Sequence, residues 1–255
     1  MQYLKDFNPP TYEYICWEAV VREGHKLDLS VLTAETLKTY ICGNPQISFS
    51  DIVIVGGDDC DVNQHLCDYL FSHGAKKIIA NNLTFTHEST DFLPIGLPDT
   101  EGYPIIGDRS IIHQKAKGQK NIKNSLLWAV GSYTYPAERV PLEKMLLNLD
   151  YVTKINADYT PRGYALYVDN VFNHKFVIAP RGSGLDTHRL WESLYLRTIP
   201  IVKSKIMEHY FSDLPILFIN DWKILTDKIF LNEKYEEIMN KKYNMDKLLL
   251  TPWVL

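Results

Sequence analysis

Residues 181–189, with the sequence RGSGLDTHR, bring two arginines, a histidine and two glycines together in one short stretch. Guanidinium groups bind anionic oxygens strongly, and glycine lets a ligand approach main-chain N–H groups closely. If a helix begins here, its first N–H groups and its dipole also favour negative charge. The chemistry expected is anion binding by Arg181, Gly182, Ser183, Gly184, Asp186, Thr187, His188 and Arg189. The alternative is an ordinary connection in which Asp186 only caps the helix and Arg189 only pairs with Glu192.

The elements around this loop predict how it is positioned. Residues 176–180 form a short apolar run typical of a buried strand. Asp186 is suited to cap a helix, and Leu190, Trp191, Leu194 and Tyr195 fall on one helical face, which makes Trp191 a core residue rather than a stacking platform. The helix ends before Pro200, and residues 199–202 begin another strand. In an open parallel sheet such a loop lies at the carboxyl end of its strand, where ligands bind.

The run P-R-G-S-G-x-D-T-H-R-x-W-E-x-L, followed by I-P-I-V, resembles the donor-binding signature of exostosin-type glycosyltransferases, which include small members in large DNA viruses of algae. The resemblance implies an α/β fold of GT-B type: two Rossmann-like lobes with parallel sheets, a cleft between them, and a nucleotide sugar held by the C-terminal lobe. The sequence departs from the family at Arg197, where a small residue, often glycine, is usual. A left-handed residue there costs roughly 1 kcal/mol without glycine, so either the turn differs or Arg197 makes a local interaction.

Further donor-binding residues follow from position and from the resemblance. Residues 126–130 form a predicted strand that ends at Gly131 and Ser132, and Arg139 lies near the start of the next helix. The family has an arginine in this place, and the resemblance implies that it reaches the donor diphosphate. Glu192 is expected to accept hydrogen bonds from the ribose hydroxyls, as acidic residues do in dinucleotide folds. Tyr159, Arg162 and Tyr164 are weaker candidates for the nucleoside pocket.

The catalytic base is expected from the first lobe. Asp58 and Asp59 follow a buried strand at residues 51–57 and are the preferred candidates, with His87 and Glu88 as the other choices. Asp61 is expected to cap the next helix. Asp59-Cys60-Asp61 also matches the D-x-D pattern by which metal-dependent GT-A glycosyltransferases hold a divalent ion. Because that reading leaves the loop at 181–189 without a role, we prefer a metal-independent scheme with no metal or other cofactor.

The order of predicted elements supports two lobes. We expect an acceptor-binding lobe over residues 1–110 and a nucleotide-sugar-binding lobe over residues 111–255, whose apolar tail could cross back to the first lobe. Strand 51–57, a helix, and strand 77–80 form a β-α-β pattern that predicts a parallel sheet. Residues 29–41 are predicted as one helix, and the proline- and glycine-rich stretch 94–118 as a linker.

Composition excludes several classes of function. The chain has 255 residues, 45% hydrophobic and 23% charged, as expected of a globular protein. A net charge of −4 supplies no basic field for nucleic acid. The four cysteines have no zinc spacing. No signal peptide or membrane-spanning run is present, so we expect a cytoplasmic protein.

These observations predict an inverting glycosyltransferase, either a hexosyl- or a pentosyltransferase. The expected donor is a nucleotide-diphosphate sugar, UDP-linked, carrying xylose or another neutral sugar. The expected acceptor is a hydroxyl on a growing glycan. A non-enzymatic alternative is a nucleotide- or glycan-binding module that keeps the anion site but has no base.

Overall fold

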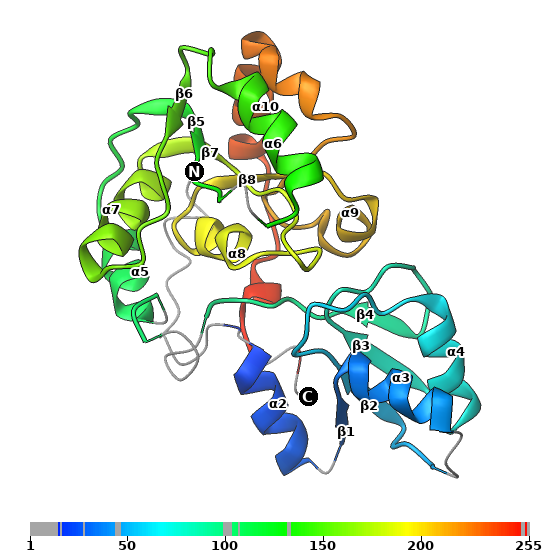
Figure 1. Cartoon of the computed structure of the whole chain (residues 1–255). Helices are drawn as coiled ribbons and strands as arrows, with labels where there is room; N and C mark the ends of the chain where they lie inside the picture. Colours follow the sequence, from blue (N-terminus) through cyan, green and yellow to red (C-terminus); the bar gives the residue numbers. More distant parts are fainter. Residues whose placement is uncertain are drawn as a thin grey trace.

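The computed structural model describes residues 15, 17–27, 29–43, 47–98, 104–106, 108–131, 134–250 and 253. Two lobes are visible in Figure 1, each built around a parallel sheet. The first sheet has the order β1-β2-β3-β4, from β1 (Ser30–Leu32), β2 (Ile52–Val55), β3 (Lys77–Ala80) and β4 (Thr90–Phe92). The second has the order β6-β5-β7-β8-β9, from β5 (Asn124–Trp128), β6 (Val152–Lys154), β7 (His174–Ile178), β8 (Ile199–Val202) and β9 (Leu217–Phe218).

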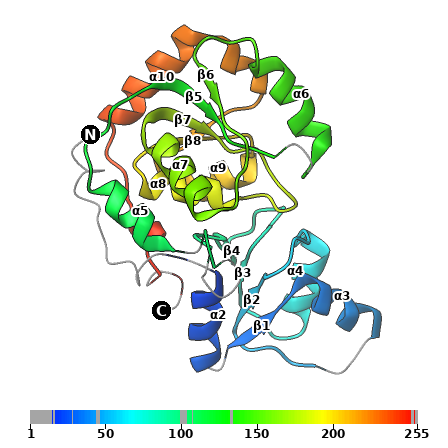
Figure 2. The ribbon, with the colours of Figure 1, turned by 60° about the vertical axis from the view of Figure 1, so that its left-hand side comes forward.

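Helices cover both sheets. The first lobe contains α2 (Trp17–Lys26), α3 (Ala34–Gly43) and α4 (Gln64–Ser72). The second contains α5 (Arg109–Ala116), α6 (Pro136–Leu146), α7 (Pro161–Phe172), α8 (His188–Tyr195), α9 (Lys205–Phe211), α10 (Lys228–Asn240) and the short helices η2 (Trp222–Thr226) and η3 (Asp246–Leu248). Because crossover connections are right-handed, α6 lies on one face of the second sheet, and α7 and α8 lie on the other. Figure 2 shows α6 and α10 together, away from α7 and α8.

The strand order of the second sheet predicts where a ligand binds. The chain runs from β5 outward to β6 on one side and then returns to β7 on the other side of β5. Ligands of open α/β sheets bind at such a reversal, beyond the carboxyl ends of the strands. The residues after β5 begin with Ala129 and lead to Gly131, and those after β7 lead to the loop at 181–187. These two segments therefore lie where the topology favours a ligand.

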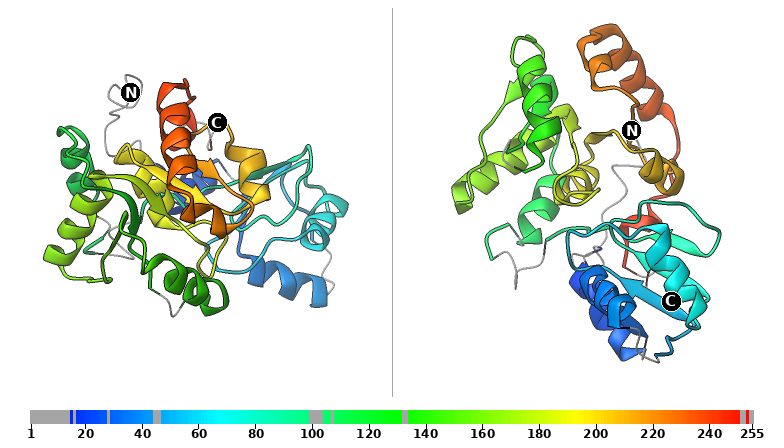
Figure 3. Two further views of the ribbon diagram at one scale, coloured as in Figure 1. Left: turned by 90° about the horizontal axis from the view of Figure 1, so that it is seen from above. Right: turned by 45° about the vertical axis from the view of Figure 1, so that its right-hand side comes forward.

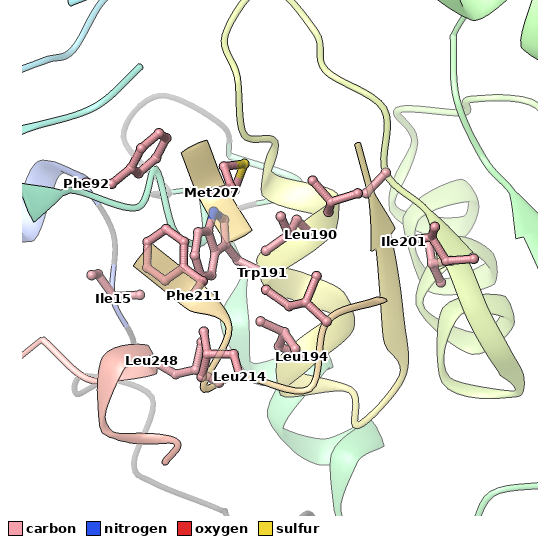
Figure 4. Packing of buried hydrophobic residues seen from close by; sticks show 14 of the residues in the cluster. Ile15, Phe92, Leu190, Trp191, Leu194, Ile201, Met207, Phe211, Leu214 and Leu248 are labelled. Atoms are coloured by element: carbon pink, nitrogen blue, oxygen red, sulfur yellow. The ribbon is translucent and has the colours of Figure 1, made fainter. Parts of the chain in front are cut away.

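The two lobes share a hydrophobic core. Phe92 of β4 contacts Phe211 of α9 at a ring-centroid distance of 5.6 Å, and Phe211 contacts Trp191 of α8 at 5.3 Å (Figure 4). Trp191 is fully buried, as expected of a core residue. The segment that ends in η3 runs from the second lobe to the first in Figures 1 and 3, and the carbonyl of Leu248 accepts hydrogen bonds from Ile15 N and the Tyr195 hydroxyl. Apolar packing thus holds the lobes together.

Several local predictions are wrong for identifiable reasons. Residues 29–41 do not form one helix, because Thr33 Oγ1 accepts a hydrogen bond from Thr36 N and starts α3 after the short strand β1. Asp61 does not cap α4, since Asn63 Oδ1 accepts from Leu66 N and takes that position. The predicted linker at 94–118 ends in helix α5, which packs on α7 and α8.

The sequence predicts no membrane-spanning segment. Among the described residues, no helix is both long and apolar enough to cross a bilayer.

Candidate active site

A cavity of about 290 Å³ opens at the carboxyl ends of β5 and β7, beside the start of α8. The predicted donor-binding residues that line it are Gly131, Arg139, Thr187, His188, Arg189 and Glu192. The weaker nucleoside candidates Tyr159 and Tyr164 line it as well, whereas Arg162 does not. Eight further lining residues were not predicted from the sequence, and most of them follow β5 or β6: Ile106, Ala129, Thr134, Ile155, Asn156, Ala157, Asp158 and Tyr167.

Two residues at the start of α8 line this cavity and carry buried polar atoms without partners. Thr187 occupies the N-cap position, with φ −139° and ψ 150°, and its side chain makes no capping hydrogen bond. Within the described part of the chain, Thr187 Oγ1 and Arg189 Nε are both buried and have no hydrogen-bond partner. A buried polar group without a partner costs about 1–3 kcal/mol. A ligand with anionic oxygens would satisfy both groups and would face the positive end of the helix dipole.

Glu192 forms the wall of the same cavity. Glu192 is 4% exposed, and its carboxylate accepts hydrogen bonds from the Tyr164 hydroxyl at 3.1 Å and the Tyr167 hydroxyl at 2.6 Å. Burial and the neighbouring Glu192 charge raise the pKa of both tyrosines, so both hydroxyls remain donors. Each carboxylate oxygen keeps a further lone pair for a ligand. The alternative pair of Glu192 with Arg189 is not formed.

Arg139 is engaged with the main chain. Its guanidinium is buried and donates to the carbonyls of Gly131 at 2.9 Å, Arg181 at 2.9 Å and Pro180 at 3.4 Å. These bonds tie the segment after β5 to the segment after β7. Arg139 therefore positions both loops and places a positive charge beside the cavity. Its direct contact with a diphosphate stays a prediction.

The loop between β7 and α8 also binds the first lobe. Asn82 Oδ1 accepts from Leu185 N at 2.8 Å, and Gly96 O accepts from His188 Nδ1 at 2.8 Å. Arg181 lies 3.7 Å from the carboxylate of Asp61. Within the loop, Gly182 N donates to Gly184 O at 3.1 Å. These contacts use loop groups that were predicted to bind an anion.

Two assignments in this loop need correction. Asp186 is not the helix cap: it is buried and accepts from Ile95 N at 2.8 Å and from Trp191 Nε1 at 2.7 Å, and its burial raises its carboxyl pKa. The glycines admit protein groups rather than leaving room for a ligand. A Cβ on Gly184 would lie 2.6 Å from Asn82 Oδ1, and one on Gly182 would lie 3.2 Å from the Arg139 guanidinium.

A second cavity of about 260 Å³ lies between the lobes. The first lobe contributes Trp17, Gly57, Asp58, Asp59, Asn81, Asn82 and Ile95, and the second contributes Gly184, Asp186 and His188. His188 thus lines both cavities. Arg181, Gly182 and Ser183 line neither, and Ser132 lies outside the described residues. Asn81 and Asn82 follow strand β3, so the rule that located Asp58 and Asp59 after β2 could have found them.

The expected base candidates have different environments. Asp58 accepts hydrogen bonds from Glu35 N and Cys60 N, one on each carboxylate oxygen, and so stabilises the start of α3. Asp59 is exposed and accepts no hydrogen bond from the described residues. His87 and Glu88 line neither cavity. The described residues contain no group of three or more His, Cys, Asp or Glu side chains able to hold a metal ion.

No family model matches the chain, and no curated protein matches it. Among solved structures, the chain is similar to an α1,3-fucosyltransferase at 13% identity, with a TM-score of 0.42, over 84% of this chain and 81% of that chain. It is also similar to an α1,3-fucosyltransferase with GDP-fucose at 12% identity, with a TM-score of 0.42, over 87% and 84% of the two chains. In this chain itself, the two parallel sheets and the cavity between the lobes confirm the GT-B-like α/β architecture expected from the sequence.

Proposed function

We propose that this protein is a glycosyltransferase that moves a sugar from a nucleotide-diphosphate donor to a glycan hydroxyl, with inversion at the anomeric carbon. One observation carries the proposal: Thr187 Oγ1 and Arg189 Nε are buried without partners where a helix N-terminus meets a cavity. This arrangement suits the oxygens of a diphosphate. Gly131, Arg139 and His188 surround the same space and add a main-chain segment and two further nitrogen-bearing side chains.

The rest of the donor fits the remaining wall of the cavity. The ribose hydroxyls would donate to Glu192, and the nucleoside would lie against Ile155, Asp158 and Tyr159. The diphosphate would then lie at the start of α8, with the sugar directed toward His188 and the second cavity. In this arrangement the positively charged groups around the diphosphate stabilise it as it leaves, while the acceptor approaches the sugar from the first lobe.

In the proposed reaction the acceptor oxygen forms a bond to the anomeric carbon while the bond from that carbon to the diphosphate oxygen breaks. The acceptor proton passes to a base, and the electron pair of the broken bond leaves with the diphosphate. Asp59 is the base proposed from the sequence. His188 is the competing candidate, because it lines both cavities and donates through Nδ1 to Gly96 O, so that Nε2 is the ring nitrogen that would take the proton.

Two substitutions decide between these bases. Asp59→Asn removes the carboxylate from an exposed side chain, and His188→Asn keeps a donor for Gly96 O while removing Nε2. The variant whose loss of transfer far exceeds its loss of donor affinity identifies the base. A variant that transfers at the native rate excludes its residue.

The identity of the donor needs its own experiment. UDP-linked xylose or another neutral UDP-sugar is the donor proposed from the sequence, together with membership of the exostosin type and a viral relationship. A panel of UDP- and GDP-sugars should be compared by thermal shift, because only ligands that prefer the folded state raise its stability, by about 2.7 kcal/mol at one hundred times Kd. If no nucleotide sugar raises the melting temperature, the proposal fails.

The two alternatives give different results with the same donor. A non-catalytic binding module would bind the nucleotide sugar and show no donor hydrolysis in the absence of an acceptor. A metal-dependent GT-A enzyme would lose activity on treatment with EDTA and regain it with Mn²⁺. The anomeric configuration of the product, read by NMR, tests inversion.

A further inference from the structure

We propose that the cavity between the lobes binds an uncharged sugar ring of the acceptor and discriminates against acidic sugars. The inference rests on the proposed glycosyl transfer for the assignment of this ring to the acceptor. The cavity of about 260 Å³ is close in size to the donor cavity of about 290 Å³, and the two meet at His188.

One wall of the cavity is the indole of Trp17. This ring packs against the loop after β2, where a Cβ on Gly57 would lie 2.7 Å from Trp17 Nε1 and one on Gly56 would lie 2.9 Å from the six-membered ring. Only glycine at these positions lets the indole lie so close to the main chain. A partly buried aromatic ring offers an apolar surface for the C–H face of a sugar, and its N–H remains available to a hydroxyl.

Three polar groups of this cavity have no partner within the described part of the chain. Asn81 is 5% exposed; its Nδ2 donates to Leu93 O at 2.6 Å, whereas its Oδ1 accepts no hydrogen bond. The carboxylate of Asp59 and Nε1 of Trp17 are likewise without partners. Because two of the three are acceptors, a ligand rich in hydroxyl donors satisfies them.

The charge of the lining decides which sugars fit. Asp58, Asp59 and Asp186 contribute carboxylates, and no lysine or arginine among the described residues lines this cavity. The donor cavity has the opposite character, because Arg139 and Arg189 line it. A carboxylate on the ligand would meet like charge in the second cavity, and repulsion at about 4 Å near a protein surface weakens binding by roughly tenfold or more. The two cavities therefore separate an anionic donor from a neutral acceptor.

The test compares sugars that differ only in charge. Binding of p-nitrophenyl glucoside and galactoside should be measured by calorimetry, without donor, against the matching glucuronide and galacturonide. We expect the neutral glycosides to bind at least about tenfold more tightly. Equal affinity for the acidic sugars, or no binding of either neutral glycoside, overturns the inference.

Substitutions locate the effect in this cavity. Asp59→Lys should narrow or reverse the preference for neutral sugars; since Asp59 is exposed and unpartnered, this change should leave folding intact. Trp17→Ala should weaken binding of neutral glycosides about tenfold or more, and Trp17→Phe should restore most of it. The thermal shift produced by the nucleotide sugar should be native in all three variants. If Asp59→Lys leaves the preference unchanged, the carboxylates do not set it and the inference is wrong.

Failure of the inference is distinguishable from failure of the proposed function. If nucleotide sugars bind and transfer occurs, but acidic and neutral glycosides bind with equal affinity, only the inference is wrong. If no nucleotide sugar binds, the proposed donor site falls, whereas the calorimetric comparison still reports on the cavity between the lobes.

Discussion

Replacing Glu192 with glutamine tests how the donor cavity recognises its ligand. The native carboxylate accepts from Tyr164 and Tyr167 through separate oxygens and is almost fully buried. Glutamine keeps one acceptor oxygen, but its NH₂ group cannot accept from a hydroxyl. One tyrosine can therefore no longer donate to this side chain and must accept from its NH₂ group, and the other must donate to a neutral oxygen in place of a charged one.

The magnitude follows from these bonds. Hydrogen bonds to charged groups contribute about 1.5–3 kcal/mol and neutral ones about 0.5–1.5 kcal/mol, so Glu192→Gln should lower the free energy of unfolding by about 2 kcal/mol. If the ribose hydroxyls donate to the same carboxylate, donor binding should lose about 2–3 kcal/mol more. That loss corresponds to roughly 30- to 160-fold weaker affinity for the nucleotide sugar.

Calorimetric titration with the nucleotide sugar and urea unfolding measure the two effects separately. Tyr167→Phe is the matched control, because it removes a hydroxyl from the pair and leaves the carboxylate in place. We expect this control to lose about 1.5–3 kcal/mol of stability and to bind the donor within about threefold of the native protein. Native donor affinity in Glu192→Gln would show that the ribose does not contact this carboxylate. Equal losses of affinity in both variants would mean that the carboxylate acts only by supporting the tyrosines.

Three further predictions concern charge, packing and metal dependence. Hydrogen bonds from Lys115 and Lys123 lower the pKa of Asp169 to about 2. This stabilisation is present above the unfolded pKa of about 3.9 and is lost as pH falls toward 2. Asp169→Asn should therefore lower the free energy of unfolding at pH 7 and weaken its dependence on pH below about 4, as measured by urea unfolding. Asp51→Asn, in an exposed pair, is the control and should change the free energy of unfolding little. Gly184→Ala should lower the free energy of unfolding by about 1–3 kcal/mol, measured in urea, because the added methyl group contacts Asn82. The loss should be much smaller when Asn82→Gly is also present, and an equal loss with and without Asn82→Gly would exclude the steric explanation. Transfer should persist in EDTA, and a requirement for Mn²⁺ would refute the metal-independent scheme.

The elements around the proposed donor site were predictable because each carries a local signal. Strand β8 has the predicted bounds, and β3 does as well, since both are short apolar runs buried in a parallel sheet. Strands β4 and β6 were missed. Each has three residues, and β6 has no buried residue, so pairing with a neighbouring strand rather than a local pattern defines them.

Arg197 illustrates a conflict that the sequence exposed but could not resolve. Its φ of +58° confirms the left-handed turn, which costs about 1 kcal/mol for a residue other than glycine. The guanidinium donates to Gly118 O at 2.7 Å and lies 5.3 Å from the centre of the Phe172 ring. A hydrogen bond from a charged group contributes about 1.5–3 kcal/mol, which is enough to offset the strain. Local sequence gave no sign of Gly118, because it lies 79 positions away.

The loop between β7 and α8 shows where site prediction from sequence stops. Its composition predicted one anion cradle, but its residues divide between two cavities: Thr187 and Arg189 face the proposed donor, and Gly184 and Asp186 face the cavity between the lobes. The division depends on Asn82 and Ile95 of the first lobe, which bind the loop from more than ninety positions away. Because His188 belongs to both cavities, a change at this residue should alter the kinetics of donor and acceptor together. Variants of this loop therefore need both substrates measured before a role is assigned to any residue in it.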